Sequence, residues 1–285
     1  MLPQPALQHL IDEALREDIG EGDHSTLSVI PPRTAGKAVL RIKQEGILAG
    51  MEVARYIFTS RDTAAVFTAF KKDGEPVQPG EKAFEVTASV HTILQCERVV
   101  LNCMQRMSGI ATLTRSYADK LKGYATRLLD TRKTTPNFRL LEKEAVRIAG
   151  GENHRFGLYD MIMLKDNHID YCGGISKAIA RAWEYVQEKK PGLKIEIETR
   201  SLADVEEVVR TGKGKVFRVM LDNFKPAQIR EALVLTGYDF ETEASGGINL
   251  DNIEAYARTG VGFVSVGALI HQAKSLDLSL KAVIT

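Results

Sequence analysis

The sequence predicts an α/β protein built from two regions, and three observations support that fold class. Short strand-like runs separated by turns fill residues 35 to 90, and strand-like runs alternate with helical runs from about residue 125 onwards. The hydrophobic fraction of 44% over 285 residues is large enough for a full buried core. Strands that alternate with helices imply βαβ units and a parallel sheet in the second region.

The first region begins with a predicted amphipathic helix over residues 6–18. Its apolar side chains recur at helical spacing and are Leu7, Leu10, Ile11, Ala14 and Leu15. The run "GEGDHST" then ends the helix. Strands are predicted in "GKAVLRIKQEG", "AAVFTAFKKDG" and "KAFEVTASV", with turns in "KDGEP" and "QPGE". A strand-rich domain is therefore expected before residue 90.

Helical spacing returns near residue 91. The runs "HTILQCERVVLNCMQRMSG" and "IATLTRSYADKLKG" predict two helices joined at Ser108 and Gly109. Six strand candidates follow, with helical segments between them: "ATRLLDTRK", "YDMIMLKDN", "LKIEIETR", "VFRVMLDN", "FETEASGG" and "VGFVSVGA". Such a pattern fits a closed barrel or a doubly wound open sheet, and the pattern alone leaves both open.

Each of the six predicted strands ends in a polar residue or a glycine. These residues are Arg132 and Lys133, Lys165, Glu198, Asp222, Ser245 with Gly246 and Gly247, and Gly267. Parallel strands place their carboxyl ends at one edge, so these residues are expected to meet there. Glycine-rich turns after the last strands commonly bind phosphate through backbone N–H groups. The pattern therefore indicates an anion-binding site.

The run "HRFGLYDMIMLKDNH" at residues 154–168 supports the same interpretation. Its apolar part, from Met161 to Leu164, lies between His154 and Arg155 on one side and Lys165 on the other. We interpret this run as a buried strand with cations at its approach and at its exit.

Composition excludes several classes of function. Lys and Arg number 38 and Asp and Glu 37, so a net charge of +1 gives no overall field to attract nucleic acid or an anionic membrane. No apolar run approaches the about 18 residues that a membrane span needs, and the N-terminal run lacks the basic start of a signal peptide. Cys96, Cys103 and Cys172 show no C-x-x-C spacing, which favours a reducing compartment. We expect a soluble, cytoplasmic protein.

Taken together, the motifs resemble those of the quinolinate phosphoribosyltransferase family. The matching runs extend from about residue 15 to 275 in the family's order: "EDIGEGDHST", "CERVVLNCMQRMSGIAT", "DTRKTTP", "GGENHRFGLYDMIMLKDNHI", "IEIE", "VMLDN", "ASGGI" and "VSVGALIH". The resemblance implies an N-terminal α/β sandwich domain over residues 1–110 and a C-terminal, seven-stranded, open (TIM-like) α/β barrel over residues 111–285. A final helix is expected to pack back on the N-terminal domain. The strand pattern itself contains six strands, one fewer.

The resemblance also implies a pentosyltransferase activity. The family transfers the phosphoribosyl group of phosphoribosyl pyrophosphate (PRPP) to quinolinate with Mg2+, and it releases nicotinate mononucleotide, CO2 and pyrophosphate in NAD biosynthesis. A homodimer or higher homo-oligomer is implied, in which the N-terminal domain of one subunit contributes to the site of its partner.

Individual roles follow from the resemblance. Quinolinate is expected to contact Arg132, His154, Arg155 and Lys165, with Arg98 from the partner subunit. PRPP is expected to contact Thr131, Lys133, Glu198, Asp222, Ser245, Gly246, Gly247, Val266, Gly267, Ala268 and His271. The expected catalytic residues are Lys133, Lys165, Glu198 and Asp222. Of these, Glu198 and Asp222 are expected to hold Mg2+ through water, since that ion keeps several waters.

Three other functions fit parts of the pattern. A phosphoribosyltransferase for nicotinate, which has one carboxylate, would need fewer cations than the sequence offers. An aldolase would use Lys133 or Lys165 as a Schiff base, which borohydride would trap. A non-catalytic paralogue that binds a phosphorylated metabolite would tolerate the loss of Glu198, Asp222 or Lys133, and all three are present.

Overall fold

The computed structural model describes residues 2–283, which divide into two compact units. The first unit contains the residues up to 115, residues 134–150 and the residues from 269 on, and the second contains residues 116–133 and 151–268. The chain therefore passes from one unit to the other after residues 115, 133, 150 and 268.

A four-stranded antiparallel sheet forms the centre of the first unit. Its strand order is β12 (Leu278–Ala282), β1 (Ala35–Ile42), β5 (Lys82–Ser89) and β3 (Val66–Ala69), and a separate pair joins β2 (Gly46–Ile47) to β4 (Pro76–Val77). The helices are α1 (Gln4–Ile19), α2 (His24–Val29), α3 (Met51–Arg61), most of α4 (Val90–Lys120) and α5 (Arg139–Ile148). The rings of Phe58 on α3 and Phe84 on β5 meet edge to face, 6.1 Å between centroids, so α3 packs on the sheet.

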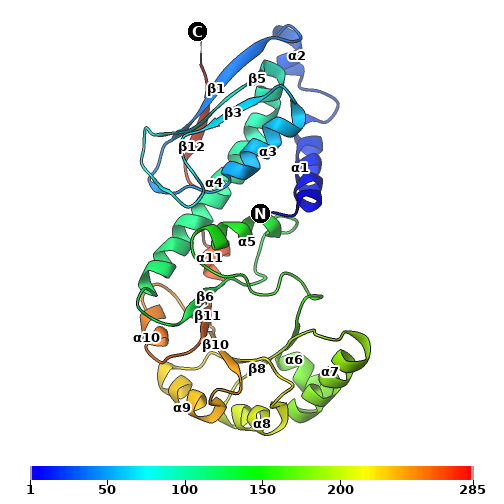
Figure 1. The fold of residues 1–285 in the computed structure, drawn as a ribbon, viewed down its shortest axis with the longest axis vertical. Coiled ribbons are helices and arrows are strands. Elements are labelled where there is room, and N and C mark those ends of the chain that lie inside the picture. Colours follow the sequence, from blue (N-terminus) through cyan, green and yellow to red (C-terminus); the bar gives the residue numbers. More distant parts are fainter. Residues whose placement is uncertain (1, 284–285) are drawn as a thin grey trace. The chain divides into compact units, whose positions relative to one another are not determined.

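The C-terminal segment is a strand where the sequence led us to expect a helix. Strand β12 pairs antiparallel with β1, which brings the C-terminal segment into the sheet of the first unit (Figure 1). Leu276, Leu278 and Leu280 alternate with polar residues, and each is at most 4% exposed. A buried side chain at every second position is the period of a strand. The helix prediction was therefore wrong for this segment.

Helix α4 runs unbroken from Val90 to Lys120, so the prediction of two helices joined at Ser108 and Gly109 was also wrong. Both residues have other roles. The Ser108 hydroxyl donates to the Ala49 carbonyl oxygen at 3.1 Å and accepts from the Ala49 N–H at 2.9 Å. A Cβ on Gly109 would lie 1.9 Å from the Lys274 carbonyl oxygen. Gly109 thus allows the close approach of another segment and does not end the helix.

The second unit is an open α/β barrel whose sheet has six parallel strands. Their order is β6 (Arg127–Leu129), β11 (Phe263–Ser265), β10 (Glu241–Ser245), β9 (Arg218–Asp222), β8 (Ile195–Thr199) and β7 (Ile162–Leu164). Helices α6 (Asp166–Cys172), α7 (Ile175–Lys189), α8 (Leu202–Gly212), α9 (Pro226–Thr236) and α10 (Ile253–Ala257) connect them, and α11 (Ala268–His271) follows β11. Figure 1 shows α7, α8 and α9 along the outside of the strands.

All six strands predicted from the sequence are present. The seventh strand implied by the family resemblance is reduced to one parallel bridge between Leu129 and Glu152, on the free side of β6. No hydrogen-bonded ladder joins β6 to β7 among residues 2–283, so the barrel stays open.

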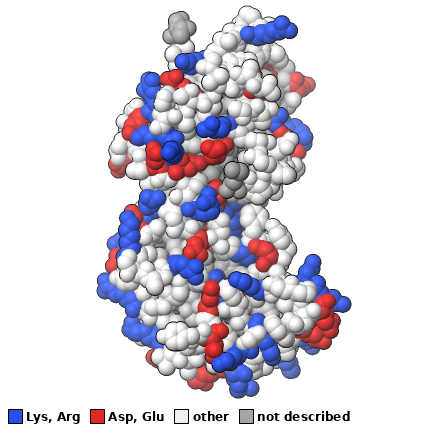
Figure 2. Space-filling view, in the orientation of Figure 1, with Lys and Arg blue, Asp and Glu red and all other residues white. Residues whose placement is uncertain are grey.

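The face of the molecule drawn in Figure 2 shows no large patch of one sign. Lys and Arg are interspersed there with Asp and Glu, as the net charge of +1 leads one to expect. Among the described residues, no helix combines the length and the apolar character that crossing a membrane requires.

Candidate active site

The carboxyl ends of the six parallel strands carry the side chains that the sequence singled out. Because the strands are parallel, these ends lie at one edge of the second unit. The predicted residues at or just after the strand ends are Arg132, Lys133, Lys165, Glu198, Asp222, Ser245 and Gly267. The structure therefore gathers cations, two carboxylates and glycine-containing turns at one edge.

Lys165 and Glu198 form an ion pair at this edge. Lys165 Nζ lies 3.7 Å from Glu198 Oε2, with the lysine exposed and the glutamate buried. Burial raises the pKa of Glu198, the charge of Lys165 lowers it, and the charge of Asp222 raises it again. The imidazole of His168 fixes the turn, since its Nδ1 accepts a hydrogen bond from the Lys165 N–H at 3.0 Å.

Arg132 and Arg155 place two positive charges close together. Burial lowers the pKa of Arg155, and the charge of Arg132 lowers it further. The half-buried Arg155 donates through Nη1 to the Met161 carbonyl oxygen at 3.3 Å. The Nε of Arg132 is buried and has no hydrogen-bond partner in the part of the chain that the structure describes. An anion between the two guanidinium groups would accept a hydrogen bond from this N–H and offset the repulsion between the two positive charges.

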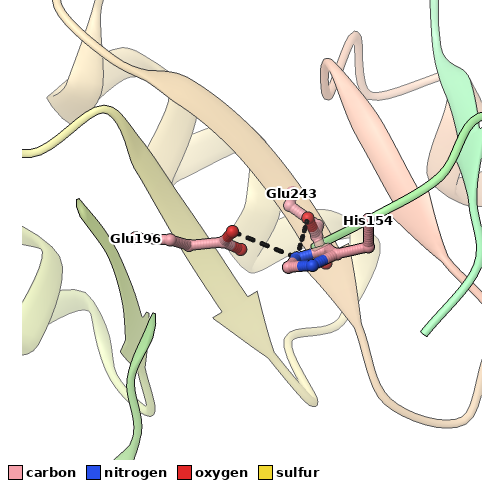
Figure 3. A group of neighbouring side chains, drawn as sticks. All are labelled: His154, Glu196 and Glu243. Atoms are coloured by element: carbon pink, nitrogen blue, oxygen red, sulfur yellow. Dashed lines mark ion pairs between the residues drawn. The ribbon is translucent and has the colours of Figure 1, made fainter. Parts of the chain in front are cut away.

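His154 lies among carboxylates in the interior of the barrel. Its side chain is only 5% exposed, and Nε2 lies 3.0 Å from Glu196 Oε2 and 3.5 Å from Glu243 Oε2. Figure 3 shows the ring between these two carboxylates, which come from β8 and β10. The His154 backbone N–H donates to Asp130 Oδ1 at 2.8 Å, and its Nδ1 accepts from the Arg155 N–H at 2.7 Å. The ring thus contacts protein groups at both nitrogens.

Opposing influences act on the protonation of this ring. Burial lowers the pKa of His154, whereas the neighbouring carboxylates of Glu196 and Glu243 raise it. The Arg155 N–H acts in the opposite sense, because a hydrogen bond to Nδ1 requires a lone pair there. At 2.7 Å this contact leaves no room for a hydrogen on Nδ1, so we assign the neutral ring with its proton on Nε2. Burial and the charge of Glu243 raise the pKa of Glu196 to about 7.

The loop after β10 has the backbone of a phosphate cradle. Gly246 and Gly247 have positive φ angles of 92° and 63°. A Cβ on Gly246 would lie 2.2 Å from Asn223 Oδ1, so a larger residue would displace the loop. The Asn223 N–H donates to the Ser245 carbonyl oxygen at 2.8 Å and so holds this loop against the end of β9. Consecutive N–H groups in such turns form concavities for anions.

The segment after β6 and the start of α11 carry further predicted residues. The Thr131 hydroxyl accepts from the Lys133 N–H at 3.1 Å, which shapes the loop and leaves the Lys133 side chain exposed. The Val266 N–H donates to the Leu129 carbonyl oxygen at 3.0 Å, so this amide is engaged within the barrel. Gly267 and Ala268 follow it at the start of α11.

Two predicted residues belong to the first unit. Arg98 is exposed on α4, and His271 is exposed at the end of α11. Neither lies on the strands or loops of the second unit.

Sequence reasoning missed a set of buried charged residues: Asp130, Glu196, Arg218 and Glu243, each at most 8% exposed. A signal for Glu196 was present in the run "IEIE". Acids two positions apart on a strand point to the same face. If Glu198 faces the barrel interior, Glu196 must face it as well.

An open α/β barrel with clustered cations and a glycine-rich loop at its strand ends is the arrangement of an enzyme fold suited to anionic, phosphate-bearing substrates. Two family models match the chain. The quinolinate phosphoribosyl transferase N-terminal domain matches residues 23–108, and the C-terminal domain of the same family matches residues 110–281. The chain belongs to the quinolinate phosphoribosyltransferase family.

Relatives agree over nearly the full length. Quinolinate phosphoribosyltransferase [decarboxylating] 1b from Nicotiana tabacum is 42% identical over 292 residues, which cover 98% of this chain and 83% of the relative. A chloroplastic nicotinate-nucleotide pyrophosphorylase [carboxylating] from Arabidopsis thaliana is 41% identical over 98% of this chain and 83% of its own. The crystal structure of NadC from Streptococcus pyogenes is 40% identical with a TM-score of 0.91, covering 100% of this chain and 99% of that one.

Proposed function

We propose that the strand-end site of the second unit transfers the phosphoribosyl group of PRPP to quinolinate with loss of CO2. The products are nicotinate mononucleotide, pyrophosphate and CO2, and the reaction serves NAD biosynthesis. One observation carries the assignment of the site. Arg132 and Arg155 lie close enough for their like charges to interact, and Arg132 keeps a buried N–H without an acceptor among the described residues.

Quinolinate has two adjacent carboxylates, so its pocket must offer several cations. Arg132, Arg155 and Lys165 offer them, and a planar guanidinium matches a carboxylate with two parallel hydrogen bonds. We assign Arg98 of the partner subunit to the same pocket. It is exposed on α4 and forms no ion pair within residues 2–283. The ring of His154 supports this pocket from inside the barrel.

A second group of residues is assigned to PRPP. The glycine cradle after β10 suits the 5′-phosphate, because its N–H groups and the Ser245 hydroxyl donate hydrogen bonds. The exposed Lys133 and His271 suit oxygens of the pyrophosphate. The residues proposed to contact PRPP are Thr131, Lys133, Glu198, Asp222, Ser245, Gly246, Gly247, Val266, Gly267, Ala268 and His271.

Glu198 and Asp222 fit a magnesium ion. Burial raises the pKa of Glu198 and the charge of Asp222 raises it further, and a divalent cation would offset both effects. Mg2+ prefers oxygen ligands and keeps several waters, so these acids would hold it through water. When bound, the ion neutralises charge on the pyrophosphate. The same carboxylates can accept hydrogen bonds from the ribose hydroxyls.

The chemistry requires no covalent enzyme nucleophile. The pyridine nitrogen of quinolinate forms a bond to ribose C1 while the bond from C1 to pyrophosphate breaks. The cations hold the acceptor in line, and such positioning contributes up to about 7–11 kcal/mol to a rate. Lys133 stabilises the departing charge. The carboxylate next to the nitrogen then leaves as CO2, its bonding electrons pass into the N-ribosylated ring, and a proton from solvent takes its place.

A homodimer and a cytoplasmic location complete the proposal. Sharing Arg98 between subunits requires at least a dimer.

The cysteines fit a reducing compartment such as the cytoplasm. Burial raises the pKa of the Cys96 thiol to about 11 and that of the Cys103 thiol to about 12, so both remain unreactive thiols.

The first experiment is an assay of the purified protein with PRPP, Mg2+ and either quinolinate or nicotinate, with mass spectrometry of the products. Mg2+-dependent nicotinate mononucleotide from quinolinate alone is expected. Lys165→Ala should lower this turnover strongly, whereas Lys177→Ala, an exposed lysine on α7, serves as the control. Product from nicotinate alone would refute the diacid pocket, and no product from either would refute the proposed reaction.

A further inference from the structure

A layer of charged side chains lies beneath the site residues inside the barrel. Residues two or four positions apart on a strand point to the same face. The pairs with the inner residue first are Glu196 and Glu198 on β8, Arg218 and Asp222 on β9, and Glu243 and Ser245 on β10. Each of these strands therefore carries a polar residue near the site edge, Glu198, Asp222 or Ser245, and a charged residue deeper on the same face, Glu196, Arg218 or Glu243.

The inner layer forms one connected cluster. Arg218 Nη1 lies 3.0 Å from Glu243 Oε2 and 3.8 Å from Glu196 Oε2, and both carboxylates also face His154 Nε2. Glu196 and Glu243 are 0% exposed, and Arg218 is 8% exposed. Neither oxygen of Glu196 forms a hydrogen bond of standard geometry within residues 2–283. Its Oε2 lies 3.0 Å from His154 Nε2 and 3.8 Å from Arg218 Nη1.

This cluster is better explained as a support than as a metal site. Ligand atoms of His154, Glu196 and Glu243 lie within 4.8 Å of one another, a spacing that a metal ion could occupy. However, the Arg155 N–H already binds Nδ1, so Nε2 carries the proton of the ring and has no lone pair for a metal. Arg218 already supplies a cation to both carboxylates.

The cluster is connected to the quinolinate pocket through His154. The Nδ1 of its ring accepts from the backbone N–H of Arg155 at 2.7 Å, and the backbone N–H of His154 donates to Asp130 Oδ1 at 2.8 Å. Asp130 directly precedes the segment that carries Arg132. The ring and backbone of His154 therefore tie together the two segments from which the pocket arginines arise.

We propose that Glu196 and Glu243, supported by Arg218, are positioning residues for quinolinate: they hold the His154 ring in place, and the ring fixes the backbone from which Arg155 reaches the substrate. A carboxylate without exposure is costly to bury, and a neutral amide of the same shape would avoid that cost. The negative charge of Glu196 and Glu243 is therefore best explained by the attraction of these carboxylates for the proton on His154 Nε2. This inference rests on the proposed role of Arg155.

The test compares Glu196→Gln with Glu241→Gln in the full-length enzyme. Glu241 is a matched control because its Oε2 also lies close to Arg218, 2.7 Å from Nη2, but it is half-buried at the amino end of β10, away from the site edge. The readouts are kcat, the KM for quinolinate, the KM for PRPP and the thermal midpoint. Misplacement of a substrate-binding group can cost about 100-fold, so Glu196→Gln should raise the quinolinate KM by roughly 10- to 100-fold. The PRPP KM should not change, and Glu241→Gln should match the wild type.

Each other outcome overturns the inference. A lower thermal midpoint with a wild-type quinolinate KM would mean that Glu196 only stabilises the fold. If Glu196→Gln does not fold, Glu243→Gln gives the same comparison, and failure of both to fold would likewise assign the cluster to stability alone. Arg155→Lys is measured in parallel. A raised quinolinate KM in Arg155→Lys but not in Glu196→Gln refutes only this inference, whereas a wild-type KM in Arg155→Lys refutes the proposed pocket itself.

Discussion

Arg155 shows how the function of one side chain depends on its neighbours. Its guanidinium is partly buried beside Arg132, an arrangement that lowers its pKa and costs free energy until an anion binds. The same side chain on an open surface would be an ordinary solvated cation. The chemistry assigned to the pocket therefore belongs to the pair of arginines and not to either residue alone.

Arg155→Lys is expected to weaken quinolinate turnover while the charge is kept. Lysine lacks the planar fork that binds a carboxylate twice, and a hydrogen bond to a charged group contributes about 1.5–3 kcal/mol. The loss corresponds to roughly 10- to 150-fold in kcat/KM for quinolinate. Steady-state kinetics would measure it. Arg147→Lys, at a 55% exposed arginine on α5, is the control, and equal kinetics in both variants would contradict the bidentate role.

Gly246→Ala is expected to impair PRPP binding. The new Cβ would lie 2.2 Å from Asn223 Oδ1, on a backbone with φ of 92°. A residue in such a region costs about 1–3 kcal/mol before the clash is counted. We therefore expect a higher KM for PRPP with little change in the KM for quinolinate.

Gly260→Ala is the control for Gly246→Ala, because it introduces the same kind of backbone strain away from the proposed phosphate site. Gly260 has a φ of 85°, but no atom lies within 4 Å of the Cβ that alanine would add. It should lose thermal stability as Gly246→Ala does, yet keep the wild-type KM for PRPP. A normal PRPP KM in Gly246→Ala would remove the loop after β10 from the phosphate site.

At the scale of the element, one glycine-to-alanine substitution in helix α4 is expected to lower the free energy of unfolding, whereas such substitutions usually raise it. Replacing a glycine in an exposed helix interior by alanine normally stabilises by about 1 kcal/mol. Gly109→Ala should instead destabilise, because its Cβ would meet the Lys274 carbonyl oxygen at 1.9 Å. Urea unfolding would measure the change. Asn102→Ala, at an exposed position of the same helix, should be neutral or slightly stabilising. A gain in stability for Gly109→Ala would show that the C-terminal segment can move away.

The elements also show what sequence can and cannot predict. All six barrel strands were predicted, because strand-like runs with polar or glycine ends alternate with helical runs along this part of the chain. Gly109 was misread as a break, since a glycine that admits a distant backbone looks the same in the sequence as one that ends a helix. The interior cluster was missed for a similar reason. His154 and Arg155 are adjacent in the sequence, and only the fold shows that one faces the interior carboxylates while the other is assigned to the substrate.

At the scale of the whole molecule, the proposed site is incomplete in one chain. The second unit supplies Arg132, Arg155 and Lys165, and Arg98 is assigned to the pocket of the partner subunit. A closed dimer with two-fold symmetry gives each subunit the same role, so each Arg98 would complete the other's pocket. A catalytic defect in one chain could then be compensated by the other.

Mixing two inactive variants tests this arrangement. Arg98→Ala and Lys165→Ala should each have little activity as pure proteins. After dissociation and reassociation, about half of the dimers are mixed and each has one intact site, so about one quarter of the wild-type activity should return. The control mixture is Arg132→Ala with Lys165→Ala, whose defects lie in the same unit and leave no intact site in a mixed dimer. Recovery in both mixtures, or in neither once native mass spectrometry detects mixed dimers, would contradict the sharing of Arg98.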